Sequence, residues 1–157
     1  MKIIVDDLQG PEIAALLEAH LDLMRSQSPP ESVHALDLDS LRVPEITFWT
    51  AWDDDTGSPT KGSLLGCGAL KQTGDQGEIK SMHTAKAARG RGIAAKLLAH
   101  LESHAQSAGI TRLNLETGSQ DGFAPARSLY AKFGYAECPP FGDYVEDPNS
   151  TFMTKAL

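Results

Sequence analysis

A glycine- and arginine-rich segment that runs straight into a helical pattern constrains this chain more than any other feature. The segment reads Ala88-Arg-Gly-Arg-Gly-Ile-Ala-Ala-Lys-Leu-Leu98, and apolar residues recur after it at helical spacing until Gly109. We therefore predict a helix that starts near Ile93. Glycines let the backbone approach a phosphate, and the first turn of a helix presents unpaired N–H groups with a partial positive charge. The segment is thus predicted to bind an anion.

A P-loop is one phosphate-binding motif in which glycines precede a helix. It requires Gly-Lys-Ser/Thr at the helix start, because the lysine reaches the terminal phosphates and the hydroxyl binds magnesium. Here Ile93 and Ala94 follow Gly92. The P-loop interpretation is therefore excluded.

A dinucleotide-binding fingerprint fits the spacing better. Gly90-x-Gly92-x-x-Ala95 matches its glycines, and Glu116 ends a predicted strand at about the distance of a ribose-binding acid. That motif should directly follow a buried hydrophobic strand, whereas the strand predicted over 78–84 carries polar side chains and lies five residues before Gly90. Too little chain follows for a doubly wound sheet, so this alternative fits less well.

The pattern Arg89-x-x-Gly92-x-Ala94 resembles the pyrophosphate loop of the GNAT superfamily of N-acetyltransferases, which reads Gln/Arg-x-x-Gly-x-Gly/Ala between a strand and a long helix. In that family a strand similar to 78–84 precedes the loop. A later helix with the pattern Ala-x-x-Leu-Tyr-x-x-x-Gly-Phe/Tyr is similar to residues 126–135 here. The family often has an asparagine three residues before the helix alanine, and Phe123 replaces it in this chain.

The resemblance implies that acetyl-CoA is the co-substrate. Strand 78–84 and a strand over 112–117 are joined by the long helix, so they should run parallel through a right-handed crossover. In the family these strands splay apart, and the pantetheine arm pairs with the exposed backbone like an added strand. The cofactor-binding residues implied by the resemblance are Met82, His83, Thr84, Arg89, Gly90, Arg91, Gly92, Ile93, Ala94 and Arg127.

Two catalytic residues are implied by position in the family pattern. Tyr130 corresponds to the general acid that protonates the leaving thiolate, and Glu78 to the general base that deprotonates the amine. Strand alternation places Glu78 on the same face as Met82 and Thr84, and His83 on the other face. His83 or a chain of waters are the alternative bases, and the Met82 N–H is a candidate oxyanion donor.

Acceptor contacts are expected from segments that lie over the pocket in the family. His34, in a segment with one or two helical turns, is one candidate, and Phe141 and Tyr144, in a loop rather than a strand, are two more. Acidic residues nearby favour a cationic amine, and we expect a small-molecule amine as acceptor. The acidic residues are Glu31, Asp143 and Glu146.

Two alternatives of different function stay open at this point. A non-catalytic acyl-CoA sensor or interaction module would keep the loop and the splayed strands but lose the acid and the base. An acetyltransferase acting on a protein N-terminus or lysine would need an open groove where segments 26–42 and 139–149 meet.

The expected fold class is α/β (α+β), with residues 1–157 as a single domain. A GNAT-like mixed central sheet of about six to seven strands should be flanked by about four helices, with the parallel strands splayed at the cofactor site. Strands are predicted near 2–6, 45–53, 63–73, 78–84, 112–117, 135–141 and 150–157. Helices are predicted from Pro11, within 31–42, from Ile93 and from Ala124-Pro125, and residues 53–62 should form an exposed loop.

Charge and composition exclude several classes of partner. A net charge of −7 argues against non-specific nucleic-acid binding, which depends on a basic face. Cys67 and Cys138 have neither metal-ligand nor disulfide-framework spacing, so no metal is expected. The start lacks the apolar core of a signal peptide and no run approaches a membrane span, so we expect a cytoplasmic protein without membrane contact. A homodimer is compatible with the sequence.

Overall fold

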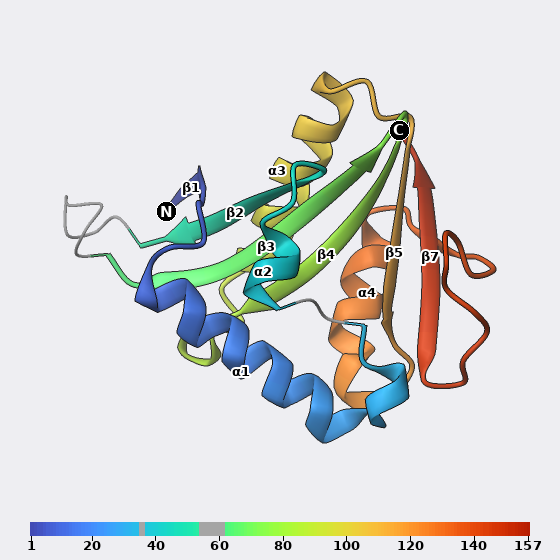
Figure 1. The fold of residues 1–157 in the computed structure, drawn as a ribbon, viewed down its shortest axis with the longest axis horizontal. Helices are drawn as coiled ribbons and strands as arrows, with labels where there is room; N and C mark the ends of the chain where they lie inside the picture. The colour runs from blue at the N-terminus through green and yellow to red at the C-terminus, as the bar shows by residue number, and fades with distance from the viewer. Residues whose placement is uncertain (35–36, 54–61) are drawn as a thin grey trace.

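The computed structural model describes residues 1–34, 37–53 and 62–157, and within them one mixed sheet carries helices on both faces (Figure 1). Its strand order is β1-β2-β3-β4-β5-β7-β6. The strands are β1 (Lys2–Val5), β2 (Ile46–Trp52), β3 (Leu64–Thr73), β4 (Gln76–Thr84), β5 (Arg112–Gly118), β6 (Ala136–Glu137) and β7 (Ser150–Ala156). The helices are α1 (Pro11–Gln27), α2 (Leu38–Leu41), α3 (Ile93–Ser107) and α4 (Ala124–Lys132), with 3-10 turns at Pro30–Ser32, Lys86–Ala88 and Asp121–Phe123. The predicted fold class is confirmed.

Two apolar layers hold the helices to the sheet. Helices α1 and α2 cover one face, whereas α3 and α4 cover the other (Figure 1). The periodic leucines predicted for α3, Leu97, Leu98 and Leu101, are all fully buried. The sheet admits α3 closely because β3 has glycine beneath it: a Cβ at Gly68 would lie 3.0 Å from Leu101 Cδ1 of α3. The layer under α3 also includes Tyr130 from α4, so the packing fixes that side chain.

Strands β4 and β5 run parallel and then separate. Their pairing begins at Gln76↔Arg112 and ends at Ile79↔Leu115. Beyond these positions β4 continues to Thr84 and β5 to Gly118, each paired only with its outer neighbour among the described residues. The predicted parallel pair and its separation are both confirmed.

A β-bulge in β4 reverses the side-chain alternation that the sequence predicts. The register against β3 shifts between Cys67↔His83 and Ala69↔Lys80, and Ser81 in the extra position has φ of 55°. The Cys67 thiol donates to the Ser81 carbonyl oxygen over 3.3 Å. Met82 therefore contacts the α3 layer, whereas Glu78 shares the α1 face with His83. The prediction that His83 points away from the face of Glu78 is wrong, because a period of two does not survive an inserted residue.

The strand predicted over 135–141 is much shorter in the structure. Only Ala136 and Glu137 pair with β7, because Pro139 and Pro140 cannot donate to a sheet ladder. Residues 138–149 then form a loop before β7. Most of the predicted loop at 53–62 lies outside the described residues.

No helix in the described part of the chain is long and apolar enough to cross a membrane. In the same residues, no group of three or more His, Cys, Asp or Glu side chains could hold a metal ion.

Helix α1, the longest of these helices, is amphipathic, since it buries Ile13 and Leu17 and exposes Glu12 and Glu18.

Candidate active site

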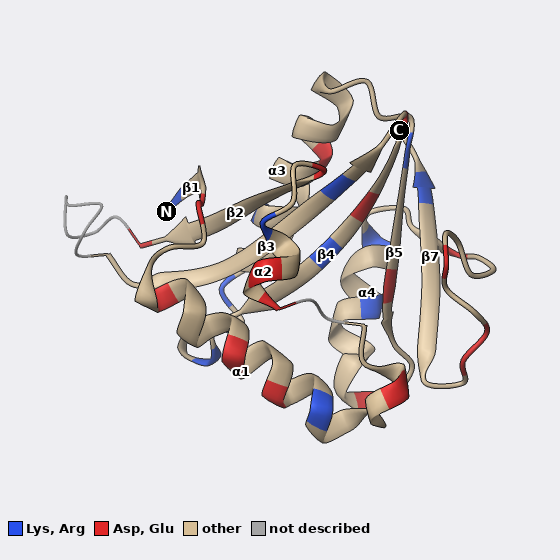
Figure 2. Cartoon of the chain, in the orientation of Figure 1, with Lys and Arg blue, Asp and Glu red and all other residues tan. Residues whose placement is uncertain are grey.

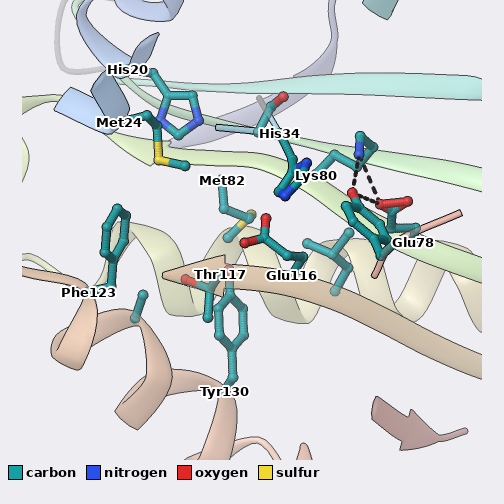
Figure 3. A pocket seen from close by; sticks show the side chains of 14 residues that line it. His20, Met24, His34, Glu78, Lys80, Met82, Glu116, Thr117, Phe123 and Tyr130 are labelled. Atoms are coloured by element: carbon teal, nitrogen blue, oxygen red, sulfur yellow. Dashed lines mark hydrogen bonds and ion pairs between the residues drawn. The ribbon is translucent and has the colours of Figure 1, made fainter. Parts of the chain in front are cut away.

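A cavity of about 100 Å³ lies where β4 and β5 separate (Figure 3). It is lined from α1, β4, β5, α4 and the loop before β7. The structure thus brings together five residues that the sequence analysis singled out from four segments of the chain. These residues are His34, Glu78, Met82, Tyr130 and Tyr144.

A wider groove of about 730 Å³ continues from this cavity over the exposed face of the sheet. His34, Glu78, Lys80 and Tyr144 line both spaces, so they form the boundary between them. Phe141 lines only the groove, where its ring lies 5.1 Å from that of Tyr144. The predicted acceptor residues therefore lie together at the entrance to the cavity.

Tyr130 enters the cavity from α4, on the face of the sheet opposite to Glu78. Its side chain is 6% exposed, and its ring meets that of Tyr135 edge to face at 5.8 Å. Burial, and next the nearby Glu116 carboxylate, raise the pKa of the Tyr130 hydroxyl above its usual value. The hydroxyl therefore remains protonated at neutral pH and is available as a proton donor.

Glu78 does not present a free carboxylate. One of its oxygens, Oε2, accepts from Lys80 Nζ and from the Tyr144 hydroxyl, each over 2.9 Å. Lys80 Nζ also lies 3.1 Å from the Tyr144 hydroxyl, and the His34 ring packs edge to face on the Tyr144 ring. This arrangement holds Tyr144 in place, and it engages the carboxylate that the sequence predicts as the base.

The glycine loop has the geometry of an anion site. Gly90 and Gly92 have φ of 78° and 76°, and a Cβ on either would meet no described heavy atom within 4 Å. Helix α3 starts directly after Gly92, and glycine has no side chain that could cap the helix. The first N–H groups of α3 can therefore donate to a group outside the helix. An approaching pyrophosphate fits this open, uncapped helix start.

The arginines around the loop differ in their surroundings. Arg89 is exposed, and Arg91 lies 3.4 Å from the Asp53 carboxylate in a half-exposed pair. Arg127 instead donates to the carbonyl oxygens of Gly118 and Gln120, over 2.7 and 2.9 Å. The structure therefore shows Arg127 fixing the loop after β5, a contact that the prediction of cofactor binding did not foresee.

A pair of histidines joins α1 to β4 beside the cavity. The Nδ1 atoms of His20 and His83 lie 3.1 Å apart, so one ring must donate and the other accept. Burial, with the neighbouring His83, lowers the pKa of His20 to about 4. Burial, with the nearby Arg89, lowers the pKa of His83 to about 4. Both rings are therefore neutral at pH 7.

The lowered pKa values of His20 and His83 should make the folded protein less stable in acid. Between pH 6.5 and about 4 the histidines are protonated in the unfolded chain but stay neutral in the folded protein. The free energy of unfolding therefore decreases as the pH falls through this window. We expect urea midpoints to fall more steeply over this range in the wild type than in His20→Gln, which keeps a hydrogen-bonding partner for His83. If the urea midpoint fell equally steeply with pH in both proteins, His20 would not be the source of the acid sensitivity.

Glu116, Lys80 and His20 are site residues that the sequence analysis did not identify. Glu116 appeared there only as a ribose-binding acid in the dinucleotide alternative. Figure 2 shows acidic positions on both β4 and β5, with a basic position on β4 alongside. The sequence predicted that β4 and β5 run parallel but not their register, and it is the register that makes Lys80 and Glu116 the residues after the last paired positions.

Comparisons with known proteins agree on one family. Residues 13–135 match the acetyltransferase (GNAT) family. The chain is 51% identical over 158 residues to YsnE of Bacillus subtilis strain 168, an uncharacterised N-acetyltransferase, with 100% of both chains covered. It is 46% identical over 153 residues to YedL of Escherichia coli K12, also an uncharacterised N-acetyltransferase, with 97% of this chain and 92% of YedL covered.

Solved structures show the same fold. A Klebsiella pneumoniae protein described as an acyl-CoA N-acyltransferase superposes with a TM-score of 0.77 at 29% identity, covering 99% of this chain and 97% of that one. A Bacillus subtilis acetyltransferase in complex with CoA superposes with a TM-score of 0.68 at 16% identity, covering 99% and 98% of the two chains. The second likeness supports the fold alone.

Proposed function

Because this chain belongs to the GNAT family and is an acetyl-CoA-dependent N-acetyltransferase, we propose that it acetylates the amine of a small molecule by direct transfer. The observation that carries this proposal is the cavity at the separation of β4 and β5. It joins the strand leading to the glycine loop with the groove that leads in from solvent. A donor and an acceptor can therefore meet there from different directions.

The loop and the separated strand supply what acetyl-CoA requires. The N–H groups at the start of α3, together with Arg89 and Arg91, would hold the pyrophosphate. The edge of β4 beyond Ile79 has lost its partner β5, so its backbone at Met82 to Thr84 can pair with the pantetheine amides. Acetyl-CoA supplies the thioester carbon that the amine attacks.

The residues around the cavity can assist the transfer from two sides. An N–H of β4 near Met82 would stabilise the negative charge that develops on the carbonyl oxygen. Tyr130 would then donate its proton to the departing thiolate sulfur. No enzyme-bound acyl group is needed, because the amine itself attacks the thioester.

The size and surroundings of the cavity favour a small acceptor. Helix α1, through His20 and Met24, closes one side, and Tyr144 with the Glu78–Lys80 ion pair closes another. Glu78 and Glu116 line the cavity and Asp143 lines the groove, and these carboxylates favour a cationic amine. A protein lysine or N-terminus would have to enter through the groove, and it is the alternative acceptor.

We expect release of free thiol when the protein, acetyl-CoA and a panel of small cationic amines are mixed. Rates should exceed background hydrolysis for at least one amine, and the product should carry one added acetyl group by mass spectrometry. Lysine-containing peptides in the same panel test the protein-acceptor alternative. Tight binding of acetyl-CoA with no thiol release for any acceptor would instead support the sensor.

A further inference from the structure

Glu116 stands at the point where the two parallel strands separate. The last paired positions are Ile79↔Leu115, so Lys80 and Glu116 are the first residues beyond the pairing. Glu116 pairs across β5 and β7 with Phe152, whose ring packs against Tyr144 and Phe141 on the groove side. Since directly paired residues share a face, the Glu116 carboxylate approaches the cavity from the side of the groove.

Tyr130 approaches the same cavity from the opposite face. It belongs to the layer under α3 and α4, whereas Glu116 lies with the aromatic side chains of the loop. Figure 3 shows the Glu116 carboxylate directed into the cavity between Met82 and the side chains at the groove entrance. An acceptor arriving through the groove would meet Glu116 before it reaches a thioester held in the gap.

We infer that Glu116 is the base that removes a proton from the acceptor amine, an inference that rests on the proposed acetyl transfer. Glu78, predicted for this role, already accepts from Lys80 and Tyr144. Among the described residues Glu116 forms no ion pair. Glu78 is then a positioning residue that holds Tyr144 at the entrance.

The surroundings of Glu116 suit a base that works near neutral pH. Burial raises the pKa of the Glu116 carboxyl to about 7, the carboxylates of Glu78 and Asp147 act in the same direction, and Ser150 and Lys80 oppose them. The other titratable groups that face the cavity are Tyr130, Tyr144, His20 and His34. A carboxyl of this kind is half ionised at pH 7, so it can take a proton from the amine and return it to water.

The proton balance of the transfer is complete with these two residues. The ammonium group gives one proton to Glu116, and the neutral nitrogen attacks the thioester carbon. The C–S bond breaks as Tyr130 gives its proton to the sulfur, and Tyr130 recovers a proton from the nitrogen of the new amide. The products are the acetylated amine and the free thiol, and Glu116 releases its proton to solvent.

Glu116→Gln tests this inference, because it keeps the shape of the side chain and removes the base. We use the best acceptor from the panel, chosen so that its own amine ionises well above pH 7. The kcat/KM of the wild type should rise with pH, with its midpoint near 7, and level off above that pH. In Glu116→Gln we expect kcat/KM at pH 7 to fall on the order of 10²-fold and the rise near 7 to disappear, with CoA affinity unchanged.

Glu78→Gln is the matched control, since it makes the same change on the neighbouring strand. It should raise KM for the acceptor and keep a rise in kcat/KM, moved to lower pH because the Glu78 charge that raises the pKa of Glu116 is gone. Loss of that rise in Glu78→Gln, or its persistence in Glu116→Gln, would overturn the inference and leave the acetyl transfer intact. A wild type that acetylates no amine would overturn the proposed function and this inference with it.

Discussion

Replacing Gly92 by valine is expected to abolish CoA binding while the protein stays folded. Gly92 has φ of 76° immediately before α3, a conformation that β-branched residues rarely adopt. A valine would shift the backbone and place two methyl groups where the pyrophosphate must approach the first N–H groups of the helix. The position is exposed and a side chain there meets no described neighbour, so the core is unaffected.

Thermal unfolding measures this effect directly. CoA at a hundredfold excess over its Kd should add about 2.7 kcal/mol to the stability of the wild type, which raises Tm by roughly 5–10 °C. Gly92→Val should show no such rise. NAD at the same concentration should leave the wild type unchanged, and a rise with NAD alone would restore the dinucleotide alternative.

Gly109→Val provides a matched control at the other end of the same helix. Gly109 also has a positive φ, 78°, and no described heavy atom lies within 4 Å of a Cβ built there. The valine therefore introduces the same kind of backbone strain without approaching the loop. CoA should raise the Tm of Gly109→Val as it does for the wild type. If CoA raised the Tm of neither variant, the result for Gly92→Val would reflect general destabilisation and not the loss of a CoA contact.

Tyr130→Phe is expected to lower kcat on the order of 10²-fold with little change in CoA affinity. Donation of a proton to the leaving thiolate contributes only in the transition state, so its loss reduces kcat and leaves ground-state binding unchanged. The phenylalanine ring retains the packing of the buried tyrosine in the layer under α3. Steady-state rates of thiol release at saturating acetyl-CoA and acceptor measure the effect.

Tyr135→Phe separates chemistry from packing in this experiment. Tyr135 is also buried, its ring contacts that of Tyr130, and its hydroxyl has no hydrogen-bond partner within the described residues. It does not line the cavity. Its kcat should remain within a few-fold of the wild type, as no proton transfer depends on it. If Tyr130→Phe retained full activity, the acid would have to be a water molecule or another group.

The conformation of the glycine loop was predictable from the sequence because its determinants are local. Gly90 and Gly92 are required by positive φ values, and the helix from Ile93 follows from the spacing of its leucines. The parallel pairing of β4 with β5 also followed, since one helix joins two strands and only one handedness of crossover is common. Tyr130 was singled out by a helix motif that spans residues 126–135.

Which residues line the cavity between β4 and β5 depended on contacts between distant segments. The bulge at Ser81 reversed the faces of His83 and Met82, because the extra residue is accommodated by pairing with β3 and not by any local pattern. The ion pair that engages Glu78 requires Tyr144, which lies 66 residues away. No spacing rule relates residues so far apart.

Sequence alone thus determined which backbone segments could hold a CoA-like ligand, because glycine conformation, helix periodicity and crossover handedness act within one supersecondary unit. Only the tertiary structure decided which carboxylate is available beside that ligand. Burial, the Ser150 hydroxyl and the charges of Lys80, Glu78 and Asp147 set the pKa of Glu116, and these groups come from β4, β7 and the loop before β7. Their distances to Glu116 are set by the folding of the sheet and its loops, so the raised pKa of Glu116 is a property of the folded protein.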